Sequence, residues 1–236
     1  MKPIYTPKGA AKEYGDYALN IYTGCPHRCY YCFAPSVLRR DREVFHNHVA
    51  PREGIVDATR KQLEAENITG KLIHLCFTCD PYPKGFDTTA TREIIKTLKE
   101  YGNHVQILTK NTGAAALDFG LLDEDDWFGV TLTGATKDQE PNAADPQNRL
   151  FMLAVARNRG IKTWVSFEPV INADWVLSCI AAHGEIFDKV KIGKLNYHPS
   201  SIDWADFGRR AEALCKKRGI DYYIKDSLRR EMGKQQ

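Results

Sequence analysis

The sequence has no long hydrophobic run, and this absence limits the classes of protein to consider. No apolar stretch in its 236 residues approaches the roughly 18 consecutive residues that a membrane-spanning helix requires. Internal repeats, low-complexity segments and a Gly/Ser-rich linker are also missing, so no boundary between domains is indicated. We therefore exclude membrane-spanning, fibrous and repeat proteins. We expect a single domain over residues 1–236, with its core at about 17–225.

We also expect no signal peptide. Residues 1–12 carry Lys2, Lys8 and Lys12 but no apolar stretch of signal-peptide length. The composition, with 43% hydrophobic and 27% charged residues, is ordinary for a globular protein in water. We therefore expect a cytoplasmic protein that makes no contact with a membrane, in a compartment where cysteines stay reduced.

The net charge of +3 is small but unevenly distributed. Residues 1–50 hold seven basic and four acidic side chains, and residues 201–236 hold nine and six, whereas residues 51–200 have a net charge of −3. A polyanion such as nucleic acid would therefore meet the basic ends before the centre. The alternative is that the basic residues at 209–218 form the solvated face of a C-terminal helix.

Apolar, β-branched runs alternate with helical segments along the chain. Strands are expected at 17–22, 72–78, 104–109, 128–132, 162–167, 190–193 and 222–224. Helices are expected near 52–66, 89–101, 146–159, 174–183 and 203–218. This alternation favours parallel strands with helical crossovers, and six such units predict an α/β fold, a partial (β/α)6 TIM-like barrel. Functional residues of such a barrel lie at the carboxyl ends of its strands.

Three of the seven cysteines are crowded into one loop. Cys25, Cys29 and Cys32 follow the first predicted strand with the spacing C-x3-C-x2-C. In a reducing compartment such a cluster is more typical of a metal site than of a disulfide framework. Three thiolates suit a 4Fe-4S cluster with one iron left open, because a filled cluster normally has four.

Two other interpretations of this loop stay open. A structural zinc ion would need a fourth ligand, for which His27, His46 and His48 are candidates. The protein would then be a zinc-stabilised binding module. Alternatively, the three thiols are unrelated and buried. Because the spacing, an aromatic neighbour and the position after a strand agree, we favour the iron–sulfur cluster.

The cysteine loop resembles that of the radical S-adenosylmethionine (SAM) superfamily. The resemblance implies a partial (β/α)6 radical SAM barrel and a 4Fe-4S cluster held by Cys25, Cys29 and Cys32. It implies that SAM binds the open iron through its amino and carboxylate groups. The implied reaction is reductive cleavage of SAM to a 5′-deoxyadenosyl radical, which abstracts hydrogen from the substrate. An electron donor such as flavodoxin or ferredoxin is then an expected partner.

Further segments within residues 17–175 resemble the spore photoproduct lyase branch of that superfamily. They are Cys76-Phe77-Thr78-Cys79-Asp80-Pro81-Tyr82, Leu108-Thr109-Lys110, Val130-Thr131-Leu132-Thr133, and Glu140-Pro141 leading to Arg149. This branch repairs a thymine dimer in DNA and returns hydrogen through a cysteine and tyrosines. The resemblance implies lyase-type repair or base modification, and its catalytic candidates here are Cys76, Cys79 and Tyr31.

The hydrogen relay of this branch has an incomplete counterpart in the chain. Phe33 stands where the second tyrosine of the relay would be, and it has no hydroxyl to give. Cys76 and Cys79 share one short stretch, and on a regular strand they would point to opposite faces. We therefore expect at most one of the two thiols to face the cavity, unless the strand bulges.

The resemblance also points to residues that would bind SAM. These are Lys110, Thr131 and Cys79. A lysine at a strand end can bind the methionyl carboxylate or the ribose, and a threonine hydroxyl serves as donor or acceptor. Glu168, which closes a predicted strand, would bind the SAM amino group or the substrate, or would form a salt bridge to Arg149.

Aromatic residues gather in two predicted strand-end loops. They are Tyr30, Tyr31, Phe33, Tyr82 and Phe86. Such rings either stack on a base, as in single-stranded nucleic-acid binders, or pack around the cluster. We therefore expect DNA or RNA as the substrate, with a peptide or a small metabolite as the alternative.

Overall fold

One open sheet organises the chain, and the computed structural model describes residues 2–233 of it. Eight strands lie side by side in chain order; β1 is antiparallel to β2, and every later neighbour is parallel. The strands are β1 (Ile4–Tyr5), β2 (Tyr17–Leu19), β3 (Leu72–Leu75), β4 (His104–Thr109), β5 (Trp127–Thr131), β6 (Lys162–Phe167), β7 (Lys189–Ile192) and β8 (Asp221–Ile224). Within the described residues β1 and β8 do not pair, so the barrel stays open.

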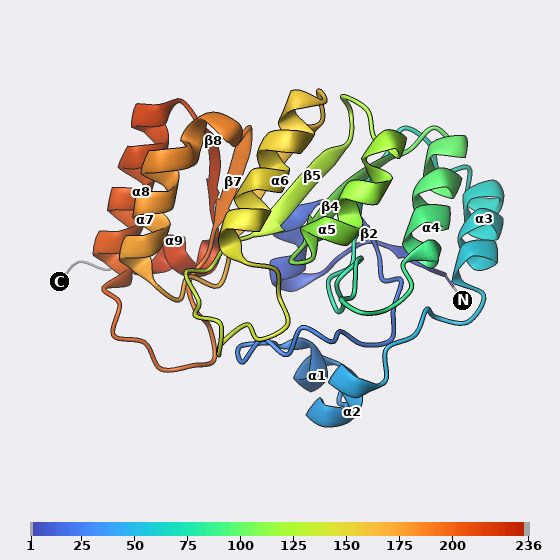
Figure 1. Cartoon of the computed structure of the whole chain (residues 1–236), viewed down its shortest axis with the longest axis horizontal. Helices are drawn as coiled ribbons and strands as arrows, with labels where there is room; N and C mark the ends of the chain where they lie inside the picture. Colours follow the sequence, from blue (N-terminus) through green and yellow to red (C-terminus); the bar gives the residue numbers. More distant parts are fainter. Residues whose placement is uncertain (1, 234–236) are drawn as a thin grey trace.

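Helices follow the strands and cover the outer face of the sheet, where Figure 1 shows α3, α4, α6, α7 and α8 in one layer. The α-helices are α1 (Ala34–Val37), α2 (Arg42–Asn47), α3 (Ile55–Glu66), α4 (Thr89–Glu100), α5 (Thr112–Ala115), α6 (Pro146–Asn158), α7 (Ala173–His183), α8 (Trp204–Arg218) and α9 (Asp226–Met232). The 3-10 helices are η1 (Gly9–Tyr14), η2 (Ala116–Leu121) and η3 (Gly184–Ile186). The predicted α/β class and the partial barrel of β/α units are therefore confirmed.

Local sequence signals account for the ends of several helices. Asp145, Asn172 and Asp203 cap α6, α7 and α8 by accepting a hydrogen bond from a backbone N–H of the first turn. Pro146 occupies the first position of α6, where its missing N–H costs nothing. Gly219 ends α8 with a positive φ of 66°, a conformation that glycine adopts without strain.

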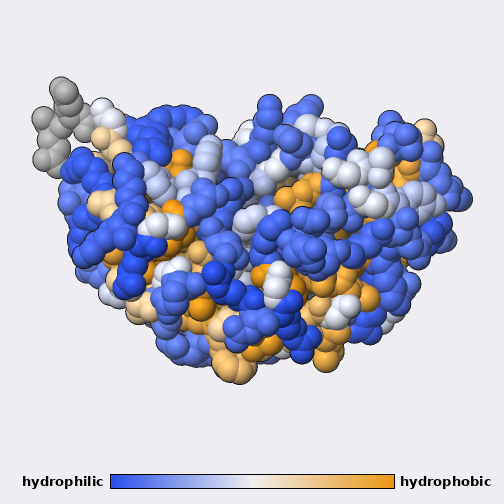
Figure 2. Space-filling view, turned by 90° about the horizontal axis from the view of Figure 1, so that it is seen from above, coloured by the Kyte–Doolittle hydropathy of each residue, from blue (hydrophilic) through white to orange (hydrophobic). Residues whose placement is uncertain are grey.

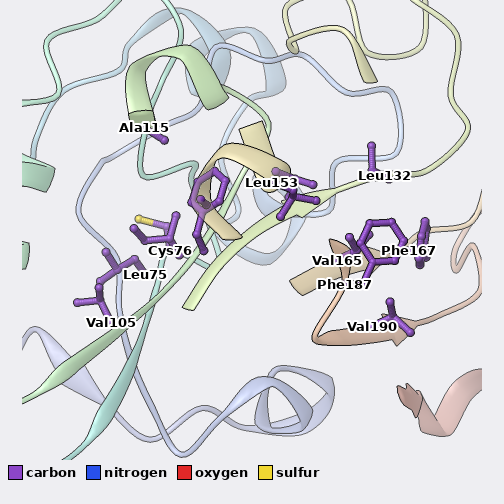
Figure 3. Packing of buried hydrophobic residues seen from close by; sticks show 14 of the residues in the cluster. Leu75, Cys76, Val105, Ala115, Leu132, Leu153, Val165, Phe167, Phe187 and Val190 are labelled. Carbon is purple, nitrogen blue, oxygen red and sulfur yellow. The ribbon is translucent and has the colours of Figure 1, made fainter. Parts of the chain in front are cut away.

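The main core lies between the sheet and the outer helices. Val105, Val165 and Val190 come from β4, β6 and β7, and each is completely buried. Figure 3 shows them in one cluster with Leu153 of α6. Burial of β4 and β6 on both faces, by the helices outside and the N-terminal segment inside, explains the near-continuous apolar runs at these positions.

The inner, concave side of the sheet is packed by the N-terminal segment. The Tyr14 ring at the end of η1 lies 5.6 Å from the His74 ring and 6.0 Å from the Trp164 ring, measured between centroids. Gln106 donates to the Tyr14 carbonyl at 3.2 Å and contacts His74 Nδ1 at 2.9 Å. Burial, with a smaller contribution from nearby Lys191, lowers the pKa of His74 to about 3, so His74 is neutral at physiological pH.

The outer surface is mainly hydrophilic. Figure 2 shows hydrophilic residues over most of the visible face, with hydrophobic ones in small patches between them. The basic residues at 209–218 are exposed on α8, which supports their interpretation as a solvated helix face. Within residues 2–233, no helix is both long enough and apolar enough to cross a membrane.

Several local predictions differ from the structure, and the predicted strand at 17–22 ends early, at Leu19. The predicted strand at 72–78 stops at Leu75, because Cys76 has a φ of 70° that turns the chain out of the sheet. The Asn20 side chain then accepts hydrogen bonds from the N–H groups of Phe77 and Thr78, at 2.8 and 3.0 Å. A further difference is at the N-terminus, where β1 and η1 extend the fold beyond the predicted core.

Candidate active site at the carboxyl ends of the strands

The predicted site residues all lie at one edge of the sheet. The cysteines at 25–32 follow β2, Lys110 follows β4, and Thr131 is the last residue of β5. Glu168 follows β6 directly. Because these strands are parallel, their carboxyl ends meet at the same side, where the short helices α1 and α2 project from the barrel in Figure 1.

The Cys loop, which we define as residues 23–33, has no regular helix or strand. Cys29 is buried, whereas Cys25 and Cys32 are partly exposed. Burial raises the pKa of the Cys29 thiol, and the nearby ammonium of Lys110 opposes that shift. The Cys32 N–H donates to the Cys29 carbonyl at 3.0 Å, which curls the end of the loop.

The three thiols of the Cys loop do not all lie within 4.8 Å of one another in this structure. Within residues 2–233, one group of three His, Cys, Asp or Glu side chains has its ligand atoms within 4.8 Å of one another. That group is His104, Asp123 and Asp125. At least two of the thiols are therefore further apart than a zinc ion, with Zn–S bonds of about 2.3 Å, could bridge. A four-iron cluster gives each cysteine its own iron and so accepts a wider spacing.

The histidines that would complete a zinc site are held by other groups. His27 Nδ1 lies 3.3 Å from Asp80 Oδ2, and His46 Nδ1 donates to the Cys25 carbonyl at 2.6 Å. The Nε2 atoms of both rings are buried and have no hydrogen-bond partner in the described residues. A histidine that binds zinc commonly has one ring nitrogen held in this way and the other free, so these contacts leave the zinc interpretation open.

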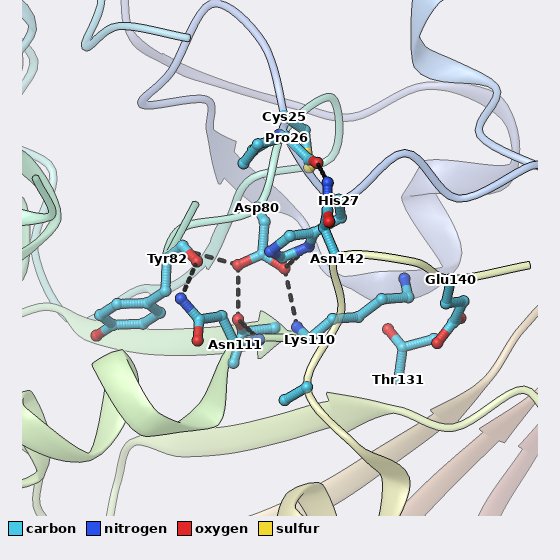
Figure 4. A network of polar contacts seen from close by, with 12 residues as sticks. Cys25, Pro26, His27, Asp80, Tyr82, Lys110, Asn111, Thr131, Glu140 and Asn142 are labelled. Atoms are coloured by element: carbon cyan, nitrogen blue, oxygen red, sulfur yellow. Dashed lines mark hydrogen bonds and ion pairs between the residues drawn. The ribbon is translucent and has the colours of Figure 1, made fainter. Parts of the chain in front are cut away.

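Asp80 is the centre of a buried polar network next to the Cys loop (Figure 4). Its carboxylate accepts from Thr109 Oγ1 at 2.6 Å, from the Lys110 N–H at 2.8 Å and from the Tyr82 N–H at 2.9 Å. Burial alone would raise the pKa of Asp80, but the contacts with His27, Thr109 and the Lys110 N–H outweigh it and lower the pKa. Asp80 is therefore an anion that fixes the ends of β3 and β4 relative to each other.

Lys110 leaves this network with its ammonium group free. Figure 4 shows its side chain running from Asp80 toward Thr131 and Glu140. The ammonium lies 5.6 Å from the centre of the Tyr31 ring and makes no hydrogen bond or ion pair within residues 2–233. Burial would lower the pKa of Lys110, but Cys29 and Glu140 outweigh it and raise the pKa, so the group stays a cation.

Glu140 forms a second buried cluster beside Lys110. It accepts from Arg149 Nη2 at 2.6 Å and from Thr133 Oγ1 at 3.1 Å. The Tyr31 hydroxyl also donates to Glu140. Burial would raise the pKa of Glu140, but Lys110 and Arg149 outweigh it and lower the pKa. The Tyr31 hydroxyl keeps its proton and directs it at this carboxylate, because burial raises the pKa of Tyr31 well above its usual value.

The hydroxyl of Thr131 stays available beside these clusters. Thr131 is buried, and its carbonyl accepts from Arg149 Nη1 at 2.7 Å. Its hydroxyl makes no hydrogen bond within the described part of the chain.

Cys76 and Cys79 lie together where the chain leaves β3. Because the strand ends at Leu75, the alternation of a regular strand does not apply to them. Cys76 is buried with its thiol 3.5 Å from the Ile21 N–H, and Cys79 is partly exposed. Burial, followed by contact with the Cys79 thiol, raises the pKa of Cys76 well above its usual value. Cys79 is thus the more accessible of the two thiols.

Glu168 has other partners than those the sequence suggests. It lies 2.7 Å from Lys225 Nζ and accepts from the Tyr14 hydroxyl at 2.5 Å. Arg149, the predicted salt-bridge partner, binds Glu140 instead. Lys225 also pairs with Glu13 at 3.0 Å, so the charges at this end of the sheet neutralise one another.

The aromatic residues divide into packing and exposed groups. Tyr82 is completely buried and belongs to the core. Phe33 and Phe86 remain 51% and 41% exposed, and Tyr197, which the sequence does not single out, is 96% exposed. The exposed rings lie in loops that follow β2, β3 and β7. They form a discontinuous rim around the carboxyl edge of the sheet.

Sequence reasoning also missed several charged residues of the site. Asp80 and Glu140 entered only as parts of a resembling segment, and Arg149 entered as a partner of Glu168 rather than of Glu140. A single acidic residue directly after a buried strand, as at Asp80, is the signal that could have found the first of them.

Three curated relatives resemble the chain at the sequence level. An uncharacterised protein of Acidianus two-tailed virus is 28% identical over 181 residues, which cover 69% of this chain and 58% of the relative. One of Mycobacterium tuberculosis (strain ATCC 25618 / H37Rv) is 28% identical over 200 residues, covering 75% and 58%. One of Methanocaldococcus jannaschii is 27% identical over 178 residues, covering 72% and 65%. The chain thus spans about three fifths of their length. No protein-family model matches the chain.

Solved structures of two enzymes share the fold of the chain. A variant of spore photoproduct lyase superposes with a TM-score of 0.70 at 12% identity, over 93% of this chain and 78% of the lyase. SuiB of Streptococcus suis, solved with SAM, gives a TM-score of 0.63 at 12% identity, over 88% and 50%. The resemblance predicted from the sequence is thereby confirmed for the fold.

Proposed function

We propose that the chain is a radical SAM enzyme. The observation that carries the proposal is the position of the three cysteines, which form one loop at the carboxyl end of β2 in a fold shared with radical SAM enzymes. Cys25, Cys29 and Cys32 would hold a 4Fe-4S cluster, because three thiolates leave one of its irons open for a further ligand. When bound, the cluster and SAM would supply reductive cleavage of the sulfonium and a 5′-deoxyadenosyl radical.

Lys110 would bind the carboxylate of SAM. Its ammonium is charged, half-buried and free of protein partners, and it lies next to Cys29. A partly desolvated cation forms a stronger hydrogen bond with a carboxylate than an exposed one does. Asp80 fixes the Lys110 backbone from the other side, so the side chain starts from a rigid position. Thr131, whose hydroxyl also lacks a protein partner, would contribute a second polar contact.

Cys79 would be either a SAM contact or the hydrogen donor to the product. It is the more exposed of the two neighbouring thiols, whereas Cys76 is buried against the backbone of Ile21. Tyr31 would serve in the transfer of hydrogen only by releasing its bond to Glu140. Glu168 would act less directly than the sequence suggests, because Lys225 and Tyr14 occupy its carboxylate.

The substrate we favour is a nucleic acid, in a reaction of the lyase-like repair or base-modification type. The exposed rings of Phe33, Phe86 and Tyr197 around the site support this choice, because aromatic rings stack on unpaired bases. A solved spore photoproduct lyase structure contains a dinucleoside spore photoproduct. A flavodoxin or ferredoxin would supply the electron, and the cytoplasm would be the site of action.

A peptide is the second candidate substrate. SuiB bound to its precursor peptide superposes on this chain with a TM-score of 0.60. The same exposed rings would then contact apolar side chains of the peptide. Binding of a single-stranded oligonucleotide that falls steeply with salt would support the nucleic acid, because phosphate contacts release counterions. The absence of such binding at low salt would favour the peptide.

Anaerobic reconstitution with iron and sulfide tests the proposed cofactor. The wild-type protein should bind four irons and release 5′-deoxyadenosine from SAM on reduction. Cys29→Ala should lose both properties while keeping its helical circular dichroism. Cys179→Ala is the matched control, since Cys179 is equally buried but lies in α7. Stoichiometric zinc without SAM cleavage would overturn the proposal.

A further inference from the structure

Arg42, the first residue of α2, contacts the Cys loop through its guanidinium. Nη2 donates to the carbonyl of Cys29 at 2.5 Å and to that of Tyr30 at 3.2 Å. Nη1 donates to the carbonyl of Cys32 at 3.3 Å. A guanidinium is planar and its donors have fixed directions. One side chain therefore sets the relative positions of two of the three candidate cluster ligands.

The rest of α2 holds the third cysteine in the same way. His46 Nδ1 donates to the Cys25 carbonyl at 2.6 Å, and the Phe45 carbonyl accepts from the Cys25 N–H at 3.3 Å. Gly24 allows this approach, because a Cβ there would stand 2.2 Å from the Phe45 carbonyl oxygen. The whole Cys loop is therefore fitted to one short helix that precedes α3.

Arg42 is poorly placed to stabilise α2 itself. A cation in the first turn of a helix opposes the helix dipole. Its neighbour Asp41 already caps the helix by accepting from the Val44 N–H at 2.9 Å. The guanidinium is part-buried, and the partners we find for it are loop carbonyls. Its contacts thus favour the geometry of the loop rather than that of the helix.

We propose that Arg42 is a positioning residue that shapes the Cys loop before the cofactor binds. The inference rests on the proposed function only for the identity of that cofactor. In the metal-free chain Arg42 orders the carbonyls of Cys29 and Cys32. Cluster assembly then loses less conformational entropy, because this part of the loop is already ordered. In the loaded protein its fixed positive charge favours the reduced, more negative cluster and raises the reduction potential.

Hydrogen exchange of the metal-free protein tests the ordering of the loop. Arg42→Gln removes the charge and the planar fork, and Arg42→Lys keeps only the charge. Both should speed amide exchange in residues 23–33 at least about tenfold. Arg39→Gln is the matched control, because Arg39 lies on the same segment but is exposed and its side chain has no partner among the described residues. Unchanged exchange in both Arg42 variants, with unchanged thermal unfolding, would overturn the inference.

The loaded protein provides the second readout. Loss of an outer contact typically weakens metal binding about 10- to 100-fold, so both Arg42 variants should release iron to a chelator faster by that factor. The reduction potential should fall in Arg42→Gln and stay near the wild-type value in Arg42→Lys. If wild type binds iron and the variants release it at the wild-type rate, this inference fails alone. If wild type binds no iron, the proposed function fails, and the exchange experiment still tests the loop.

Discussion

Two lysines at strand ends of the same sheet have opposite surroundings. Lys225, after β8, is 3% exposed and pairs with both Glu13 and Glu168. Lys110, after β4, is less buried, yet its ammonium has no ion pair in the described chain. The charge of Lys225 is paired with carboxylates of the protein, whereas the charge of Lys110 is available to a ligand.

The two halves of the carboxyl edge therefore serve different purposes. At β6 to β8, Tyr14 and Lys225 saturate Glu168, and the result is a buried ionic joint. At β2 to β5, carboxylates hold backbone groups and leave the thiols and Lys110 free. Buried ionisable groups mark a functional site only where a ligand-binding atom remains unpaired. By that criterion the Cys-loop half is the candidate site, and the half around Glu168 is structural.

The largest effect is expected at the saturated lysine. Lys225→Met leaves Glu13 and Glu168 as buried, uncompensated carboxylates, which should lower the free energy of unfolding by about 3 kcal/mol. The corresponding fall in Tm for a domain of this size is on the order of 10 °C, measurable by calorimetry. Lys225→Met combined with Glu168→Gln should recover part of the loss. If Lys225→Met alone is as stable as wild type, the ion pairs of Lys225 do not stabilise the fold.

The free lysine should show the reverse pattern. Lys110→Met should weaken SAM binding about 10- to 100-fold, because a charge-assisted hydrogen bond contributes roughly 1.5–3 kcal/mol. Unfolding should change by less than about 1 kcal/mol, since no protein partner is lost. Equilibrium binding and thermal unfolding of the same sample measure both. Strong destabilisation with unchanged SAM affinity would reverse the roles that we assign to the two lysines.

Acid should lower the free energy of unfolding through His74, which packs on the inner side of the sheet. Its pKa is lowered to about 3 by burial, so the unfolded chain takes up the proton first as the pH falls. Neutral His74 therefore makes its full contribution to stability above about pH 6.5, and this contribution is lost as the pH falls toward 3. The loss between pH 6.5 and 5 is about 2 kcal/mol. His74→Gln should show a shallower slope, whereas His48→Gln, at an exposed position, should keep the wild-type slope.

The smallest effect is expected for the hydroxyl that joins η1 to β6. Tyr14→Phe removes the hydrogen bonds to Glu168 and Ser166 and keeps the ring. The expected loss is about 1–2 kcal/mol by denaturant unfolding. SAM cleavage should be unaffected, because this half of the edge is structural. A variant with normal stability but no SAM cleavage would move the functional boundary to include β6.

Much of the fold could be predicted because its signals are local. The strands at 104–109 and 162–167 match β4 and β6 residue for residue, and caps such as Asp203 and Gly219 delimit α8. The end of β3 could not be predicted, because the turn at Cys76 depends on the side chain of Asn20, which follows a different strand. Such a contact leaves no local pattern in the sequence.

The candidate site was predictable to a similar degree. The Cys loop follows a strand and has a recognisable spacing, and Lys110 was found through the family resemblance at another strand end. The partner of Glu168 lies 57 residues away in sequence, and that of Tyr31 lies 109 residues away. The burial of single residues could not be predicted either. Tyr82 and Phe86 lie in one loop, but of these two only Tyr82 enters the core. Partners and burial depend on tertiary packing, which one sequence without relatives does not reveal.

The joint between the first and last parts of the sheet has a consequence for biosynthesis. Ala10 and Lys225 are in contact although 215 residues separate them along the chain. At ribosomal speeds of roughly 5–20 residues per second, the N-terminal segment waits about 10–40 s for its partner to be made. Until then Glu13 lacks its partner Lys225, and the half-made sheet exposes its inner side. The nascent polypeptide should therefore depend most on chaperones after the N-terminal segment has been made and before β8 follows.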